Sequence, residues 1–77
     1  MLDNAHIAFI GGGAMGEAII KGLLAEDAVM PDQIIASDPV SARREQLAAE
    51  YGVRTTADNV DAVREADIIV LCVKPQM

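Results

Sequence analysis

The 77-residue sequence is poor in cysteine and in aromatic residues. Its single cysteine, Cys72, cannot form an internal disulfide, and such sparing use of cysteine fits a reducing, cytoplasmic environment. The chain has one tyrosine, one phenylalanine and no tryptophan, although 52% of its residues are hydrophobic. Any core must therefore be built mainly from aliphatic side chains.

Long apolar runs and basic clusters are lacking too. No apolar run approaches the roughly 20 residues that span a bilayer. Residues 1–4 carry neither a basic stretch nor a hydrophobic segment, so no signal peptide is expected. The chain has six lysines and arginines in total and twelve acidic residues, which gives a formal net charge of −6. Because no basic cluster exceeds Arg43-Arg44, binding of nucleic acid or anionic lipid through a charged face is not expected.

Residue sets typical of catalytic or metal sites are also missing. His6 is the only histidine, and no cysteine or acid stands at ligand spacing from it, which argues against a metal site. No Ser/His/Asp or Cys/His arrangement is present, and the carboxylates fall at helix caps or on exposed helix faces. No catalytic residue is therefore predicted in this sequence.

What the sequence does contain is a glycine-rich run at positions 11–16 with the pattern G-x-G-x-x-G. It follows an apolar run and precedes a helical pattern, which is the strand–turn–helix context of a dinucleotide-binding motif. Gly11 would allow a sharp turn, Gly13 would let a pyrophosphate approach the backbone, and Gly16 would let the helix pack closely on the strand. The phosphates would meet unpaired N–H groups at the positive end of the helix dipole. A purely structural turn, or another kind of phosphate site, is the alternative interpretation.

Strand-like and helix-like segments alternate along the chain. In chain order, the predicted elements cover residues 6–10, 14–25, 34–37, 39–51, 53–55, a short helix capped by Asp58, and 68–73. The first and last strands are continuous apolar runs, as in buried parallel sheets. Crossovers through helices make neighbouring strands parallel and the connections right-handed. We expect a Rossmann-like α/β fold, in which a parallel sheet with flanking helices has the strand order 3-2-1-4 and is truncated after its fourth strand.

Periodicity also predicts which side chains face the core. They are Met15, Ala18, Ile19 and Leu23 in the first helix, Val40, Leu47, Ala48 and Tyr51 in the second, and Val60 and Val63 in the third. Glu17 and Lys21 are expected to form an exposed i,i+4 pair. Asp38 is expected to cap the second helix with Pro39 at its first position, and Gly52 to end it.

Asp38 ends the second predicted strand, 22 positions after Gly16 (38 − 16). This spacing is close to the roughly 20 residues expected for an acid that binds the ribose 2′-OH of NAD. A carboxylate there would repel the 2′-phosphate of NADP, whereas Ser37 could donate to that phosphate and Arg43 or Arg44 could pair with it. Both NAD(H) and NADP(H) therefore remain open as the cofactor.

Several segments together resemble the N-terminal domain of pyrroline-5-carboxylate reductases. The resemblance is carried by residues 7–19, 36–39, 51–53, 58–59 and 68–76, in order and at matching spacing. The ending Val73-Lys74-Pro75-Gln76 is its most specific part, because the glycine turn is shared with related dehydrogenases.

The resemblance implies an oxidoreductase of proline biosynthesis that passes a hydride from NADPH or NADH to 1-pyrroline-5-carboxylate, giving L-proline. It implies that residues 1–77 form an N-terminal dinucleotide-binding domain. The family's helical C-terminal domain, with the substrate pocket and the homo-oligomer contacts, is absent, so the segment alone would be inactive. Two alternatives stand beside this reading: the cofactor domain of a hydroxyacid or prephenate-type dehydrogenase, and a non-catalytic dinucleotide-sensing module.

The same resemblance assigns residues to the cofactor. Those expected to wrap the pyrophosphate are Ile10, Gly11, Gly12, Gly13, Ala14 and Met15; those at the adenosine side are Ser37, Asp38 and Asn59; those along the path to the nicotinamide are Cys72, Val73, Lys74 and Pro75. Family members often have a small residue such as alanine where Cys72 stands, so only its backbone role carries over.

Overall fold

A four-stranded parallel sheet forms the centre of the molecule. The computed structural model describes residues 4–11 and 13–72. The strands are β1 (Ile7–Ile10), β2 (Ile34–Ser37), β3 (Arg54–Thr56) and β4 (Ile68–Leu71), in the order β3-β2-β1-β4. The helices are α1 (Ala14–Ala25), the 3₁₀ turn η1 (Pro31–Gln33), α2 (Ser41–Tyr51) and α3 (Asn59–Val63). The predicted Rossmann-like fold and its strand order 3-2-1-4 are confirmed, with every pair of neighbouring strands parallel.

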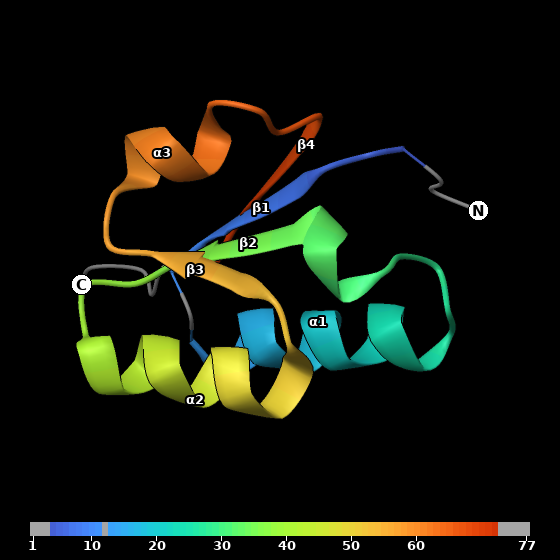
Figure 1. The fold of residues 1–77 in the computed structure, drawn as a ribbon, viewed down its shortest axis with the longest axis horizontal. Helices are drawn as coiled ribbons and strands as arrows, with labels where there is room; N and C mark the ends of the chain where they lie inside the picture. Colours follow the sequence, from blue (N-terminus) through green and yellow to red (C-terminus); the bar gives the residue numbers. More distant parts are fainter. Residues whose placement is uncertain (1–3, 12, 73–77) are drawn as a thin grey trace.

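Helices cover both faces of this sheet. Figure 1 shows α1 and α2 on one face and α3 on the other. Strand β1 lies inside the sheet, and its four side chains are all buried. Because successive side chains of a strand point to opposite faces, both faces of β1 must be apolar. This explains why its sequence is a continuous apolar run rather than an alternating one.

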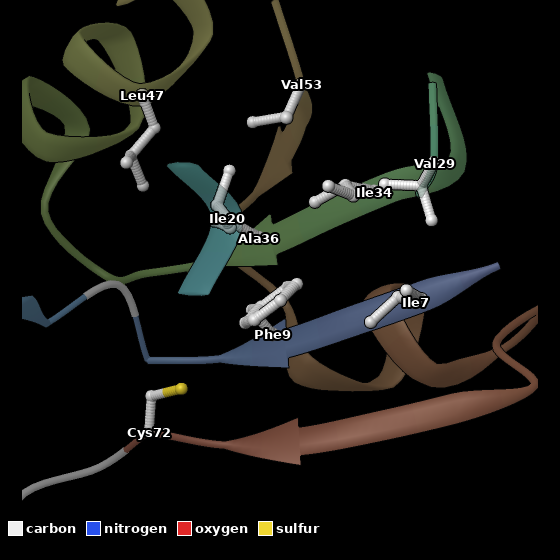
Figure 2. Close-up of a cluster of buried hydrophobic side chains, with 9 residues drawn as sticks. All are labelled: Ile7, Phe9, Ile20, Val29, Ile34, Ala36, Leu47, Val53 and Cys72. Atoms are coloured by element: carbon white, nitrogen blue, oxygen red, sulfur yellow. The ribbon is translucent and has the colours of Figure 1, made fainter. Parts of the chain in front are cut away.

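Two hydrophobic clusters fill the space between the helices and the sheet. The larger, on the α1 and α2 face (Figure 2), consists of Ile7, Phe9, Ile20, Val29, Ile34, Ala36, Leu47, Val53 and Cys72. The smaller consists of Ala8, Ile10 and Ala62, with Ile35, Val63 and Ala66 packed against it. Phe9 is the one aromatic side chain that is fully buried among the described residues, so the core is aliphatic as predicted.

Strand β4 is more exposed than its apolar sequence predicts. The side chains of Ile69 and Leu71 are 51% and 71% exposed, and Ile68 is also exposed. The expectation of a buried fourth strand is therefore wrong for Ile68, Ile69 and Leu71, whereas Val70 is partly buried and packs against the larger cluster. Within the described sheet β4 pairs only with β1, so the other edge of this apolar strand is unpaired there.

The core-facing residues of helix α1 only partly match the predicted ones, among which Leu23 packs against the larger cluster. Met15 is 69% exposed, and Ala18 and Ile19 are exposed too, whereas Gly16 and Ile20 are buried. Residues 16 and 20 lie on one face of a helix, one position away from residues 15 and 19. Gly16 lies close to Gly11 and Cys72, which directly follow β1 and β4, and this places residue 16 on the buried face of the helix.

Gly16 packs directly against Cys72. An added Cβ on Gly16 would lie 3.1 Å from Cys72 Sγ and 3.3 Å from the carbonyl oxygen of Gly11. These distances are tighter than ordinary van der Waals contact, so even one methyl group would require its neighbours to move. The predicted close packing of the helix on the strand at Gly16 is thus confirmed.

This contact predicts energetic coupling between Gly16 and Cys72. We expect Gly16→Ala to lower the free energy of unfolding by about 1–2 kcal/mol, because overpacking outweighs the better helix propensity of alanine. In a Cys72→Ala background, which removes Sγ, the same change should cost about 1 kcal/mol less. Urea unfolding of the two single variants and the double variant measures this coupling. Additive effects would show that the two side chains do not compete for space.

The ends of the later elements differ from the predictions by one or two residues. Helix α2 begins at Ser41 with Val40 as its N-cap, so Asp38 and Pro39 lie outside the helix. Gly52 ends α2 in the left-handed conformation, with φ 71°, as predicted. The N-cap of α3 is Asp58, whose Oδ1 accepts a hydrogen bond from the Val60 N–H at 2.8 Å. Strand β3 begins one residue later than expected.

In the later helices, three more side chains that are predicted to face the core are exposed instead. Val40, the N-cap of α2, and Val60, in the first turn of α3, are both exposed. Ala48 is exposed as well, while Leu47 is fully buried and is the residue through which α2 reaches the larger cluster. Tyr51 and Val63 are partly buried and pack against the two clusters, as predicted.

Candidate functional site

The glycine turn lies at the carboxyl end of β1, where the chain turns into α1. Gly11 has φ 89°, a left-handed conformation that residues with a Cβ rarely adopt. Its N–H donates to the carbonyl oxygen of Ser37 at 2.9 Å, and Ile10 is paired in the sheet with Ser37 and Leu71. The predicted sharp turn at Gly11 is confirmed, but its N–H group serves the fold and is not left for a ligand. Gly12 lies outside the described residues.

Within the part of the chain that the structure describes, the first N–H groups of α1 have no hydrogen-bond acceptor. Gly13 is the N-cap and offers no side-chain cap, and the first helical hydrogen bond runs from Glu17 N to Gly13 O at 3.0 Å. The N–H groups of Ala14, Met15 and Gly16 precede that bond and have no acceptor within the helix. Such a helix end attracts anions, because its N–H groups and its dipole both favour negative charge.

The backbone at Gly13 is open. Among the described residues, a Cβ added there would meet only the carbonyl oxygen of Cys72, at an ordinary contact distance of 3.5 Å. Gly13 has extended dihedral angles that any residue can adopt, so the fold itself does not require glycine at this position. The fold therefore leaves unexplained why residue 13 lacks a side chain, whereas a phosphate approaching the first turn of α1 would explain it.

Cys72 borders the glycine turn from the end of β4. Its N–H donates to the carbonyl oxygen of Ile10 at 2.8 Å, and its side chain is buried against Gly16. Burial raises the pKa of the Cys72 thiol, so this thiol stays protonated and is a packing group rather than a nucleophile. Val73, Lys74 and Pro75, which were also expected along the path to the nicotinamide, lie outside the described residues.

Ser37 and Asn59 come together at the carboxyl edge of β2. Ser37 is 1% exposed, and its hydroxyl donates to Oδ1 of Asn59, the first residue of α3. The Ser37 side chain is therefore buried, with its hydroxyl turned toward Asn59. Ser37 holds the exposed Asn59 side chain at this edge, a contact that their separation of 22 positions conceals in the sequence.

Asp38 continues β2 beyond the sheet. Its N–H donates to Thr56 O at 3.0 Å, and its Oδ1 accepts from the Val40 N–H at 2.8 Å. Its carbonyl oxygen accepts from Arg44 Nη1 at 2.7 Å. The carboxylate thus orders the β2–α2 connection. The structure places Asp38 at the end of β2, where an acid that binds ribose is found in this fold, but corrects its predicted role as the cap of α2.

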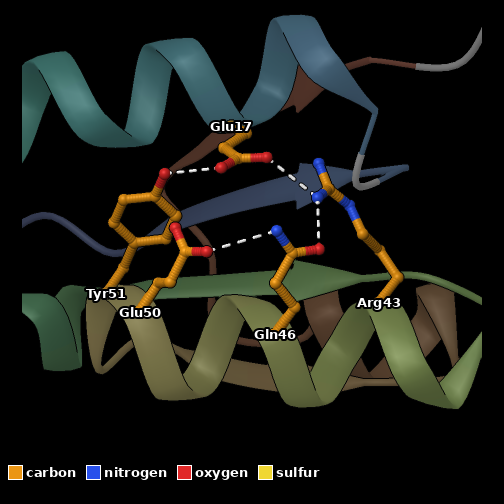
Figure 3. Close-up of polar contacts among 5 residues, drawn as sticks. All are labelled: Glu17, Arg43, Gln46, Glu50 and Tyr51. Atoms are coloured by element: carbon orange, nitrogen blue, oxygen red, sulfur yellow. Dashed lines mark hydrogen bonds and ion pairs between the residues drawn. The ribbon is translucent and has the colours of Figure 1, made fainter.

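A polar network joins α1 to α2 (Figure 3). Glu17 Oε1 forms an ion pair with Arg43 Nη1 at 2.8 Å, and Tyr51 Oη donates to Glu17 Oε2 at 2.6 Å. Arg43 also donates to Gln46 Oε1 at 2.9 Å. Glu17 was predicted to pair with Lys21, four residues away, but the structure directs its carboxylate to α2. Arg43 and Tyr51 are distant from Glu17 in the sequence, so no local pattern could have revealed this network.

The network shifts the titration of two of its members. The hydrogen bonds from Tyr51 and Arg43 lower the pKa of the Glu17 carboxyl from its ordinary value of 4.5. The hydrogen bond to Glu17 raises the pKa of Tyr51 from 10.0 to about 12. A lowered acid pKa contributes stability above pH 4.5 that is lost as the pH falls through the folded-state value. The raised tyrosine pKa contributes stability below pH 10 that is lost as the pH rises toward 12.

Glu17→Gln tests this assignment. Tyr51 is the only tyrosine of the chain, so the ultraviolet absorbance of tyrosinate reports on it alone. We expect the titration midpoint to lie near 12 in the unchanged chain and to fall toward the ordinary value of 10.0 when the carboxylate is removed. The matched change Glu50→Gln, on the exposed side of α2, should leave most of the shift in place. Equal midpoints in Glu17→Gln and the unchanged chain would contradict the Tyr51–Glu17 hydrogen bond.

Two hollows lie away from the glycine turn, and both are bordered by His6, the residue before β1. The larger, of about 310 Å³, is lined by Asn4, His6, Met30, Asp32 and Gln33. The smaller, of about 30 Å³, is lined by His6, Ile35, Arg54, Asp61, Ala62, Glu65 and Ala66. Neither contains the N-terminus of α1, and ligands of open parallel sheets bind at the opposite, carboxyl edge.

Of the helices in residues 4–11 and 13–72, none has the length and apolar character needed to cross a membrane. In the same residues, no three histidine, cysteine, aspartate or glutamate side chains gather in a way that could hold a metal ion.

Comparisons with known proteins agree with this geometry. Residues 6–77 match the family described as NADP oxidoreductase, coenzyme F420-dependent. The pyrroline-5-carboxylate reductase of Vibrio alginolyticus is 47% identical over 76 residues, which are 99% of this chain and 28% of that protein. The pyrroline-5-carboxylate reductase of Methanosarcina acetivorans is 43% identical over 75 residues, which are 97% of this chain and 28% of that protein.

A solved structure gives the same result. The structure of a pyrroline-5-carboxylate reductase from Coxiella burnetii superposes with a TM-score of 0.86 at 37% identity, covering 92% of this chain and 26% of that one. The chain thus spans little more than a quarter of the length of the proteins that it matches. These similarities confirm the resemblance to pyrroline-5-carboxylate reductases, and the chain belongs to the NADP oxidoreductase, coenzyme F420-dependent family.

Proposed function

We propose that this chain is the N-terminal dinucleotide-binding domain, residues 1–77, of a pyrroline-5-carboxylate reductase that uses NAD(P)H. The observation that carries the proposal is the first turn of α1, whose N–H groups are uncapped beside the open backbone of Gly13. The similarity to pyrroline-5-carboxylate reductases over nearly the whole chain supports this choice of enzyme over other dehydrogenases.

In this proposal the chain's residues hold and orient the cofactor. The pyrophosphate is held by the turn formed by Ile10, Gly11, Gly12, Gly13, Ala14 and Met15, the adenosine side by Ser37, Asp38 and Asn59, and the nicotinamide side by Cys72, Val73, Lys74 and Pro75. The donors to the phosphates are the N–H groups of Ala14 and Met15, while Gly11 shapes the turn. Ser37 acts indirectly by holding Asn59.

When bound, NAD(P)H supplies the hydride that reduces 1-pyrroline-5-carboxylate to L-proline. We assign the substrate pocket and the contacts of a homo-oligomer to parts of the protein outside this chain, and we place the protein in the cytoplasm, in keeping with its sparing use of cysteine.

The full-length protein tests the proposal in two steps. We expect it to bind NADPH or NADH, and to consume the bound cofactor with formation of proline when 1-pyrroline-5-carboxylate is added. Turnover of a hydroxy acid or of prephenate instead would identify a related dehydrogenase. Dinucleotide binding without turnover of any of these substrates would indicate a sensing module, and loss of all dinucleotide binding would overturn the proposal at its base.

A further inference from the structure

We infer that Arg44 selects NADP(H) over NAD(H) by binding the 2′-phosphate of the cofactor, and that the neighbouring Arg43 does not. The inference rests on the proposed function, because it assumes a dinucleotide bound at the glycine turn. It concerns two adjacent arginines that the sequence alone does not distinguish. Their contacts in the structure are different in kind.

Arg44 is held at the carboxyl edge of the sheet. Its Nη1 donates to the carbonyl oxygen of Asp38 at 2.7 Å, and the residue is half-buried. This contact places the guanidinium beside the end of β2, where the ribose of a dinucleotide lies in folds of this kind. A guanidinium carries five N–H donors, so most of them remain for a second partner. Their planar fork matches the oxygens of a phosphate.

The charge of Arg44 is not compensated by a carboxylate. Among residues 4–11 and 13–72, Arg44 takes part in no ion pair, and its one hydrogen bond is to a neutral carbonyl. Holding a partly desolvated cation without a counter-charge has a free-energy cost. An anionic ligand at the same edge would remove this cost, and the 2′-phosphate is the group that distinguishes NADP from NAD there.

Arg43 has the opposite surroundings. It is paired with Glu17 of α1 at 2.8 Å and bonded to Gln46 at 2.9 Å, as Figure 3 shows. Consecutive residues of a helix point about 100° apart, which follows from 3.6 residues per turn. Arg43 therefore reaches toward α1 while Arg44 reaches back to the end of β2. The Glu17 carboxylate already balances the charge of Arg43.

The other groups near the end of β2 do not replace Arg44. Ser37 is buried, and its hydroxyl donates to Asn59. The Asp38 carboxylate accepts the Val40 N–H within its own loop, and its negative charge would repel a phosphate rather than bind it. Among the described cations outside α2, Arg54 lines the small hollow near His6, and Arg64 pairs with Asp61.

Binding measurements on the full-length protein test the inference. The dissociation constants of NADPH and NADH are measured from the nicotinamide fluorescence for the unchanged protein, Arg44→Gln, Arg44→Lys and the matched control Arg43→Gln. We expect Arg44→Gln to weaken NADPH binding about tenfold or more, the size of a lost charge-assisted hydrogen bond, and to change NADH binding less than about twofold. Arg44→Lys should keep part of the preference. Arg43→Gln should leave the ratio of the two constants unchanged.

Each contrary outcome has a distinct meaning. An unchanged NADPH-to-NADH ratio in Arg44→Gln, with folding confirmed by circular dichroism, would overturn the role of Arg44. A larger shift of this ratio in Arg43→Gln than in Arg44→Gln would show that Arg43, and not Arg44, binds the 2′-phosphate. If the unchanged protein bound neither dinucleotide, the proposed function itself would fail.

The salt dependence of binding is a second test of the role of Arg44. Rising salt should weaken NADPH binding more than NADH binding, and Arg44→Gln should remove this difference.

Discussion

Replacing Gly13 with aspartate is expected to abolish dinucleotide binding without weakening the fold. Gly13 already has the extended dihedral angles of an N-cap residue, and an added Cβ meets nothing closer than 3.5 Å. An aspartate there would bond the N–H groups of the first turn and place a negative charge at the positive end of α1. Stability should stay the same or rise by about 0.5 kcal/mol, since aspartate caps slightly better than glycine. The same carboxylate would occupy the position of the phosphate, and its negative charge would repel the phosphate.

The affinity loss should be large. We expect the dissociation constants of both NADPH and NADH to rise about 100-fold or more, which corresponds to about 2.7 kcal/mol. Calorimetric titration measures the affinity, and urea unfolding measures the stability of the same variant. Gly22→Ala is the matched control, because its added Cβ meets nothing within 4 Å. It should raise stability by about 0.5–1 kcal/mol and leave binding unchanged. Normal affinity in Gly13→Asp would show that the phosphates bind elsewhere.

Replacing Phe9 with alanine is expected to have the largest effect on stability. Phe9 is fully buried at the centre of β1, in the cluster that joins the sheet to α1 and α2. Truncating a buried phenylalanine costs about 3–5 kcal/mol, from lost transfer free energy and the cavity left behind. This is comparable with the whole stability of many small domains, about 5–15 kcal/mol. Because β1 leads directly into Gly11, the turn should lose its order together with the strand.

Urea unfolding and dinucleotide affinity of Phe9→Ala, measured in the same protein, check this prediction. Phe9→Leu should be intermediate, because it leaves a smaller cavity. Val60→Ala serves as the control, since Val60 is a large apolar side chain that is 63% exposed, and truncating it should change stability by less than about 0.5 kcal/mol. A loss below about 1 kcal/mol in Phe9→Ala would contradict the central place of this side chain in the core.

The topology of this chain was readable from its sequence because each strand and helix carries its own local signal. Strand β1 is a continuous apolar run that ends at Gly11, and α1 starts and ends where the pattern predicts. The order of strands and helices then leaves few parallel arrangements, all with right-handed crossovers. The position of the glycine turn at the carboxyl edge of the sheet followed from the same reasoning.

Hydrophobic periodicity alone mispredicts the rotation of α1, because it does not include the packing of Gly16 against its neighbours. Met15 and Ile19 are more apolar than Gly16, so periodicity alone favours them as the buried face. A glycine that lets a helix approach a strand must itself face that strand, and Ile20 then follows it on the same side. The two predictions were incompatible, and the close contact at Gly16 decided between them.

The polar partners of the site could not be predicted from the sequence. Glu17 bonds to Arg43 and Tyr51, which α2 brings beside α1 only when both helices pack on the sheet. Ser37 and Asn59 likewise meet because the carboxyl end of β2 lies beside the start of α3. Local spacing favours partners such as Lys21 for Glu17, since residues four apart are neighbours on a helix. Tertiary contacts displaced these local pairings.

The most direct measurement of the central claim is a map of amide signals by NMR as NADPH or NADH is added to isotope-labelled protein. If the first turn of α1 holds the diphosphate, the largest shifts should fall on the N–H signals of Gly13, Ala14 and Met15, and the signals of Asn4, His6 and Gln33 should stay in place. Shifts centred on these last residues, which line the larger hollow, with unchanged signals at the start of α1, would contradict the account.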